Sequence, residues 1–346
     1  MEAKLIPDFL PFRFPLENRM AQENITFERA EIDKESIRKI LDDDIGKLFE
    51  KHYESTADIL SKCKFVQFDG DLKELETRML SGESIELMFL LYVGKTRNDL
   101  RTNIKTPDLS VLIFLNRLGR FAKLLGDASG KEVSVKIAVE NEYMDKYIDR
   151  VSSDEENTLF IMKKLMDEFS ISNIYLERME NFLGGETFSE EFKRQITSFS
   201  KDDGIMLGEK NYSIVNISRY FFPTASFESA VRTYTTDEGN KRIDEMTLQS
   251  VIRYRAFMKA RDVTGFWERN KRYIRSTVSY KPGVITYSYY VGRLAPLHGV
   301  AVIIDGRIST EYFYDVAYAA CEANAPIKVL YYGELAMCID ATGLAL

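Results

Sequence analysis

The chain has 346 residues, of which 45% are hydrophobic and 29% are charged. This composition is typical of a folded globular protein and excludes a chain that is disordered as a whole. The 47 Lys and Arg residues are outnumbered by 54 Asp and Glu residues, which gives a net charge of −7. That balance disfavours a general nucleic-acid-binding protein, because such a protein needs a basic surface.

The numbers and spacing of the cysteines and histidines narrow the class of protein further. The three cysteines are an odd number and form no CxxC pair, which argues against a disulfide framework and fits a reducing compartment. The two histidines, His52 and His298, cannot supply a His-rich metal site, so no metal is expected. The N-terminus lacks the pattern of a signal peptide, and no apolar run approaches the roughly 18 residues of a membrane helix. We therefore expect a soluble, cytoplasmic protein without membrane partners.

The N-terminal part divides into two regions. Residues 1–30 carry Pro7, Pro11 and Pro15, which are too closely spaced for a helix interior, and are expected to form an extended arm. The remainder, residues 31–346, is expected to be a single α/β domain. Apolar residues recur at helical intervals over 33–49, where Asp33 or Ser36 would serve as the N-cap.

The middle of the chain alternates between apolar runs and amphipathic stretches. Such alternation predicts an α/β fold with a mainly parallel, Rossmann-like sheet flanked by helices. Strands are expected at Ile85–Val93, Val133–Val139 and Asn173–Leu176, and helices at Leu109–Leu125 and Glu155–Phe169.

The C-terminal part is predicted to be β-rich from about residue 270. Three strands follow one another with short connections, which indicates antiparallel pairing. These strands are expected at Tyr273–Ser279, Val284–Val291 and Val300–Asp305. A helix is expected before them, at Glu245–Met258, and a helix at Glu311–Ala323 and a strand at Ile327–Tyr332 are expected after them.

A Gly94-Lys95-Thr96 segment follows the first predicted strand, as in nucleotide-binding loops. Such a loop needs a glycine five residues before the Gly-Lys pair, and Phe89 occupies that position, so a nucleotide P-loop is excluded. Lys95 and Asn98 nevertheless lie at the carboxyl end of a strand, where open α/β sheets bind ligands. A lysine, neighbouring arginines and an amide fit a phosphorylated small molecule, and an ordinary solvated loop is the alternative.

Two residues are candidates for proton transfer. His298 stands just before an apolar strand, and its ordinary pKa of about 6.5 suits acid–base chemistry near neutrality. A structural histidine is the alternative. Glu142 follows the predicted strand Val133–Val139, so its carboxylate could face the same crevice as Lys95, although helix capping would explain it equally well.

Arginines dominate the stretch from 241 to 275, the most basic part of the chain. Arg275 and Thr277 would share one face of a strand. An inward arginine needs an anionic partner, which is either a ligand or one of the protein's own carboxylates. Arg253 and Arg255 are further candidates. Aromatic residues within this stretch would also suit RNA, but the acidic chain favours a solvated face or an anion pocket.

Three segments, taken in order, resemble the isonitrile (isocyanide) synthases of the pyoverdine/dityrosine biosynthesis family. Leu91–Asn98, followed by Pro107-Asp108 and an apolar helix, is similar to the family's strand-end pattern of aromatic, Pro, any, Lys, Ser, any, Asn. Tyr273–Ser279 looks like its Ile-Arg-Leu-Ser strand. Ala295–Val302 is similar to its Thr-Pro-Trp-His-Gly-Val segment.

The resemblance implies an enzyme of the carbon–carbon lyase type that needs no metal or other cofactor. It would join the amine of tyrosine or tryptophan to ribulose 5-phosphate, a co-substrate, and leave one sugar carbon on nitrogen as the isonitrile. By this resemblance, Lys95 and Asn98 would bind the sugar phosphate or its hydroxyls, and Arg275, with Arg253 or Arg255, would neutralise an anionic group. His298 would transfer protons, and Glu142 and Lys95 are further catalytic candidates.

Two other classes stay open at this point. Another enzyme acting on sugar phosphates or amino acids could use the same fold. A non-catalytic protein could bind an anion or RNA through the basic stretch, with strong salt dependence. In the family that the chain resembles, a non-haem iron, 2-oxoglutarate-dependent oxygenase often acts next, so such an oxygenase is a possible partner.

Overall fold

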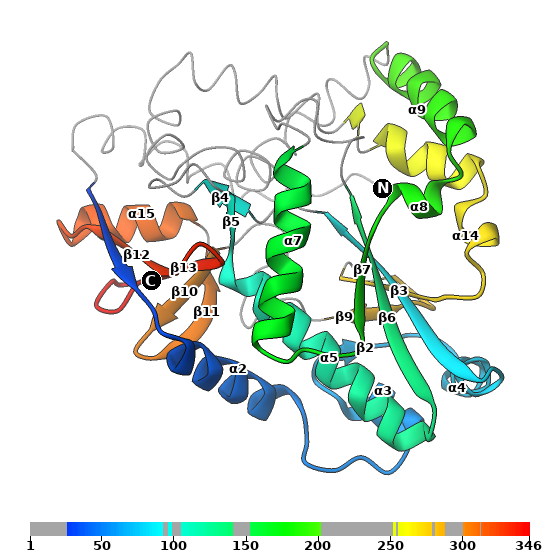
Figure 1. Cartoon of the computed structure of the whole chain (residues 1–346), viewed down its shortest axis with the longest axis horizontal. Coiled ribbons are helices and arrows are strands. Elements are labelled where there is room, and N and C mark those ends of the chain that lie inside the picture. Colours follow the sequence, from blue (N-terminus) through cyan, green and yellow to red (C-terminus); the bar gives the residue numbers. More distant parts are fainter. Residues whose placement is uncertain are drawn as a thin grey trace, which may run out of the picture.

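The computed structural model shows a mixed α/β protein with two main sheets (Figure 1). A small hairpin of β4 (Thr96–Asn98) and β5 (Lys105–Pro107) accompanies them. No helix in the described part of the chain is long and apolar enough to cross a membrane. The structure describes residues 26–92, 96–98, 105–140, 153–201, 252–253, 255–278, 281–287, 300–311 and 313–346.

The larger sheet has six strands, and all its pairings are parallel except that of β2 with β9. This confirms the prediction of a mainly parallel sheet for the middle of the chain. The strand order is β2 (Val66–Gln67), β9 (Ile285–Tyr287), β8 (Ile274–Thr277), β3 (Ser84–Tyr92), β6 (Glu132–Glu140) and β7 (Ile174–Arg178).

The second sheet has five strands and holds most of the C-terminal part. Its pairings alternate between parallel and antiparallel. Its order is β1 (Phe27–Glu31), β12 (Ile327–Tyr332), β13 (Ala336–Asp340), β10 (Val300–Ile304) and β11 (Arg307–Glu311), and α15 (Phe313–Glu322) connects β11 to β12. The β-rich C-terminal part is thus confirmed.

The predicted antiparallel pairing of the strands after residue 270 is wrong. β8 and β9 are parallel to each other, and β10 belongs to the other sheet. Parallel neighbours usually need a long crossover. Here the register pairs Ser276 with Ile285, so the strands overlap only at the end of one and the start of the other. The chain therefore has to return over a short distance, which the few residues between Thr277 and Ile285 can span.

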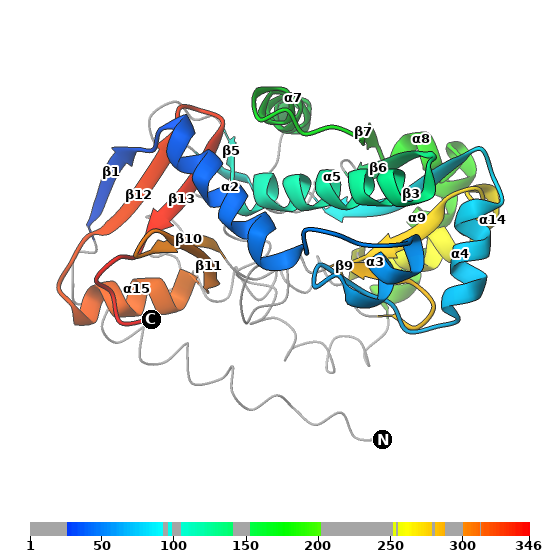
Figure 2. The ribbon, with the colours of Figure 1, turned by 90° about the horizontal axis from the view of Figure 1, so that it is seen from below.

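Two long helices are positioned by the caps that the sequence predicts. Asp33 caps α2 (Lys34–Leu48), because its carboxylate accepts from the Ser36 amide at 2.7 Å. Asp108 caps α5 (Leu109–Ser129) in the same way, and Gly130 ends that helix in a left-handed conformation. Figure 2 shows α5 starting beside the five-stranded sheet and running along the six-stranded one. The helix thereby connects the two halves of the protein.

Helices cover the six-stranded sheet on both faces. Phe89 and Tyr287 belong to the aromatic core that packs against α5, α3 (Thr56–Lys62) and α4 (Leu72–Leu80). On the opposite face, Met88 and Ala138 pack against phenylalanines of other helices. That layer comprises α8 (Glu180–Leu183), α9 (Glu186–Phe199), a helix ending at 263 and α14 (Phe266–Arg269), while α7 (Ser153–Glu168) contacts α5.

An ion pair without solvent exposure joins α2 to α5. The Arg117 Nε lies 2.7 Å from Asp44 Oδ2, and its Nη2 lies 2.7 Å from Oδ1. Both side chains are 0% exposed. A second polar contact ties α2 to more distant elements, because the Glu168 carboxylate of α7 accepts from Lys34 and from the Tyr332 hydroxyl. These contacts fix α2 between the sheets.

Candidate functional site

A group of cations surrounds Trp267 on the face of the six-stranded sheet that carries α14. The Arg275 guanidinium carbon lies 4.3 Å from the centroid of the Trp267 ring, and that of Arg261 lies 5.6 Å from it. Lys281 belongs to the same group, since the charges of Arg275 and Arg261 act on its ammonium. We call Arg261, Trp267, Arg275 and Lys281 the Trp267 cluster.

Strand alternation directs Arg275 into the cluster. Ile274 packs in the aromatic core on one face of the sheet, and the Ser276 hydroxyl donates to the Met88 carbonyl at 2.9 Å. Arg275 lies between them in sequence and therefore faces the opposite side, where Trp267 lies. Residues of β8 alternate between buried and half-buried in the same way. The predicted alternation around Arg275 is confirmed.

The turn after the helix ending at 263 brings Arg261 and Trp267 together. Gly265 has a left-handed backbone with φ of 67°, a conformation that glycine adopts without steric cost, and it reverses the chain into α14. Arg261 is only 4% exposed, and its Nε and Nη2 lie 3.2 and 3.0 Å from Asp262 Oδ1. The Asp262 side chain itself is 58% exposed. One carboxylate, mostly in water, thus faces the buried guanidinium.

The cluster carries more positive than negative charge. Within the described ranges, Arg275 and Lys281 have neither an ion-pair partner nor a hydrogen-bond acceptor. Burial and the nearby Arg261 lower the pKa of Arg275, and Asp262 opposes this only in part. The pKa of Lys281 is lowered by burial and then by Arg275 and Arg261. Three buried or half-buried cations therefore face one mostly exposed carboxylate.

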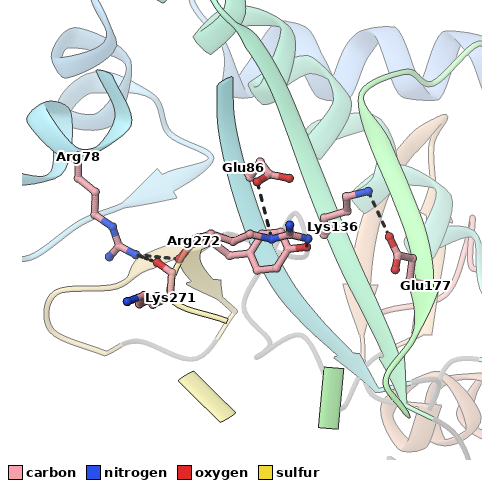
Figure 3. A network of polar contacts seen from close by, with 7 residues as sticks. Arg78, Glu86, Lys136, Glu177, Lys271 and Arg272 are labelled. Carbon is pink, nitrogen blue, oxygen red and sulfur yellow. Dashed lines mark hydrogen bonds and ion pairs between the residues drawn. The ribbon is translucent and has the colours of Figure 1, made fainter. Parts of the chain in front are cut away.

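Other basic side chains around the six-stranded sheet contact carboxylates or main-chain carbonyls (Figure 3). Lys136 lies 3.1 Å from Glu177, and Arg272 lies 3.9 Å from Glu86. Arg78 donates to two main-chain carbonyls of the segment that leads into β8, at 2.8 and 2.9 Å. These cations have partners within the fold, so the lack of partners in the Trp267 cluster is not a general property of this face.

Among the predicted site residues with described side chains, only Arg275 belongs to this cluster. Arg253, which is buried, lies over the Phe192 ring at 5.3 Å, and Arg255 is exposed. The arginine whose charge acts on Arg275 is Arg261. Binding roles for Arg253 and Arg255 stay predictions.

The remaining predicted residues cannot be placed in a site. Asn98 ends β4, where its main chain pairs with Lys105 of β5. Lys95, Glu142 and His298 lie outside the described residues. Their catalytic and binding roles therefore stay predictions.

Sequence reasoning missed the grouping of Lys281 with Trp267. Lys281 stands in a Lys-Pro-Gly turn signal, and Trp267 and Arg261 belong to the basic stretch. Nothing in their spacing indicates that they meet, because the meeting depends on the turn at Gly265 and on the parallel pairing of β8 with β9. The available signal was the basic stretch as a whole, for which a solvated face and an anion pocket were both open interpretations.

Asp108 joins the start of α5 to the start of β10. Its carboxylate is 1% exposed and accepts from the Ser110 amide at 3.0 Å, and the Ala301 amide lies 3.3 Å from each carboxylate oxygen. Asp108 also pairs with Met337 of β13. Asp108 therefore fixes the start of β10, the strand in which the predicted segment Ala295–Val302 ends.

Comparison with known proteins gives a fold relationship. No family model matches the chain, and no curated protein matches it. The crystal structure of the PvcA protein from Pseudomonas aeruginosa is similar, with a TM-score of 0.52 that covers 94% of this chain and 99% of that chain. The two sequences are 11% identical. The two proteins thus share a fold over nearly their whole length.

Proposed function

We propose that this chain is an isonitrile synthase. It would convert the α-amino group of an aromatic L-amino acid, tyrosine or tryptophan, to an isonitrile, with ribulose 5-phosphate as carbon donor. PvcA, whose fold covers 94% of the chain, is an isonitrile synthase. The sequence segments that resemble this class support the same function independently of the fold.

The observation that carries the proposal is the convergence of these segments. The first continues β3 and the second contains β8, and the two strands pair in parallel with Phe89 opposite Ser276. Their carboxyl ends therefore lie at the same edge of the sheet. The third segment leads into β10, where Ala301 is hydrogen-bonded to Asp108, two residues that the same resemblance includes. Each of these two contacts joins parts of the resembling segments that lie nearly 200 residues apart in sequence.

The proposed chemistry explains why such a region needs both cations and proton carriers. The substrate amine condenses with the ketone of ribulose 5-phosphate and loses water, which gives an imine. Proton transfers and cleavage of both carbon–carbon bonds of the former ketone carbon then leave that single carbon on nitrogen. We propose His298 and Glu142 for the proton transfers, Lys95 and Asn98 for contacts to the sugar, and Arg275 for an anionic group of the substrates.

The test is direct detection of the product. Purified, EDTA-treated protein is incubated with ribulose 5-phosphate and each aromatic amino acid in turn. Mass spectrometry should find an amino acid that has gained one carbon and lost two hydrogens, with the infrared absorption of an isonitrile. Lack of this product with every aromatic amino acid, from protein with an intact fold, would contradict the proposal.

A histidine pair tests the assigned acid–base residue. His298→Ala should abolish product formation with the fold intact. His52→Ala is the matched control, because His52 is the other histidine of the chain and is exposed. Wild-type turnover by His298→Ala would remove His298 from the mechanism.

A further inference from the structure

We infer that the Trp267 cluster is a binding site for a phosphate dianion, and hence for the phosphate group of a phosphorylated substrate. The substrate assignment rests on the proposed function, whereas the anion site itself does not. The inference starts from two guanidinium groups that lie over one aromatic ring, Arg261 from the helix ending at 263 and Arg275 from β8. Lys281, in the turn before β9, is close enough to both for their charges to act on its ammonium.

Charge matching favours phosphate over carboxylate. Three positive charges and the single negative charge of Asp262 leave an excess of two. A phosphate group carries about −1.5 to −2 at pH 7, whereas a carboxylate carries −1. Two guanidinium groups can each donate in a forked geometry to phosphate oxygens, and the lysine adds a compact charge. Phosphate therefore neutralises the cluster, while a carboxylate would leave part of the repulsion.

Trp267 provides a further observation. Its Nε1 is buried and has no acceptor among the residues that the structure describes. A buried donor without an acceptor is unfavourable, and a tryptophan N–H usually finds one. The donor belongs to the same ring that both guanidinium groups cover. A bound phosphate would supply the missing acceptor as well as the missing negative charge.

The site differs from the one that sequence alone predicts for phosphate. Lys95 and Asn98 were assigned to the sugar phosphate or its hydroxyls. With the phosphate at Arg275 and Lys281, these two residues are left for the hydroxyls. The Trp267 cluster then anchors the end of the sugar that does not react, which leaves the ketone free to meet the amine.

Binding can be read directly, because Trp267 is the single tryptophan of the chain. The protein is titrated with inorganic phosphate at constant ionic strength, and both heat and tryptophan emission are recorded. We expect saturable binding with a parallel change in emission. Heat of binding without any emission change would mean that phosphate binds elsewhere. Absence of binding, or equal affinity for acetate and phenylalanine, would also overturn the inference.

Variants identify the residues responsible. Loss of one charge-assisted hydrogen bond should weaken phosphate binding roughly 10- to 100-fold in Arg275→Gln and in Lys281→Gln. Lys259→Gln is the matched control, because Lys259 is an exposed lysine on the helix that carries Arg261. Circular dichroism verifies that each variant is folded. Unchanged affinity in folded Arg275→Gln and Lys281→Gln would overturn the inference.

The experiment separates this inference from the proposed function. Inorganic phosphate needs no turnover, so a protein that binds it in the cluster but forms no isonitrile keeps the site and loses the proposed reaction. Conversely, if isonitrile forms and Lys281→Gln leaves the KM for ribulose 5-phosphate unchanged, the reaction stands and the assignment of this phosphate fails.

Discussion

Removal of Arg117 from the buried pair with Asp44 should be strongly destabilising. Both side chains are 0% exposed and are joined by two contacts of 2.7 Å. Arg117→Met keeps most of the apolar volume but leaves a carboxylate buried among apolar neighbours. Loss of one partner of such a pair costs about 3–5 kcal/mol. Since whole domains are stable by only about 5–15 kcal/mol, this is a large fraction of the total.

The assay is equilibrium unfolding in urea, followed by circular dichroism. Arg194→Met is the matched control, because Arg194 lies 2.7 Å from Glu191 on α9 but is 68% exposed. Water screens that pair, so its loss should leave the unfolding midpoint unchanged within error. A double variant, Asp44→Leu with Arg117→Met, should regain much of the stability because no charge stays buried. Equal effects of Arg117→Met and Arg194→Met would refute the argument from burial.

Three further predictions concern the site and its supports. The pKa of Lys281 is lowered, so its ammonium loses its proton below the usual 10.5. Phosphate affinity should therefore be at full strength below this lowered pKa and should fall as the pH rises through it, as calorimetry across alkaline pH would show. Lys281→Arg should flatten this pH profile, and an equal fall of affinity in both proteins would assign the fall to another group. Asp108→Ala removes a helix cap and leaves the Ala301 amide without its acceptor, so urea unfolding should show a loss of about 1–4 kcal/mol, and an unchanged midpoint would refute a role in fixing β10. Burial raises the pKa of the Cys338 thiol, so this cysteine should react with thiol reagents only after the protein is unfolded. Fast labelling of Cys338 in the folded protein, detected by mass spectrometry, would contradict the structure.

The elements that the sequence predicts well are those with local signals. Asp33 and Asp108 each lie directly before an apolar helix, and their caps form within a few residues. Continuous apolar runs identify β3 and β6, because strands of a parallel sheet are buried on both faces. The order of these strands with β7 follows from the alternation of strand and helix.

The direction and partner of β8 could not be predicted from its neighbours in sequence. Its main partner is β3, almost 200 residues away, and the short connection to β9 resembles a hairpin. Register across the sheet, rather than turn chemistry, decides the pairing. The same dependence on distant contacts explains why the division of the C-terminal strands between two sheets was missed.

In the candidate site too, local features could be predicted from the sequence and contacts between distant residues could not. Alternation along β8 was enough to predict that Arg275 lies on the opposite face from Ser276. The resemblance implied Arg253 or Arg255 as its partner in binding an anion, whereas the structure brings Arg261 to Trp267 beside Arg275 through the turn at Gly265. A position within a basic stretch says nothing about which of its members meet, because a single left-handed residue redirects the chain.

The charges around β8 distinguish structural cations from functional ones. Lys136 and Arg272 have carboxylates beside them, so they stabilise the fold without a ligand. Burial lowers the pKa of both Arg275 and Lys281, and neighbouring positive charge lowers it further, from Arg261 at Arg275 and from Arg275 and Arg261 at Lys281, so the fold holds these charges at a cost. Residues that oppose stability in this way are typical of functional sites, where a ligand supplies what the fold lacks. The component that this region lacks is negative charge, which is what the proposed phosphate ligand would supply.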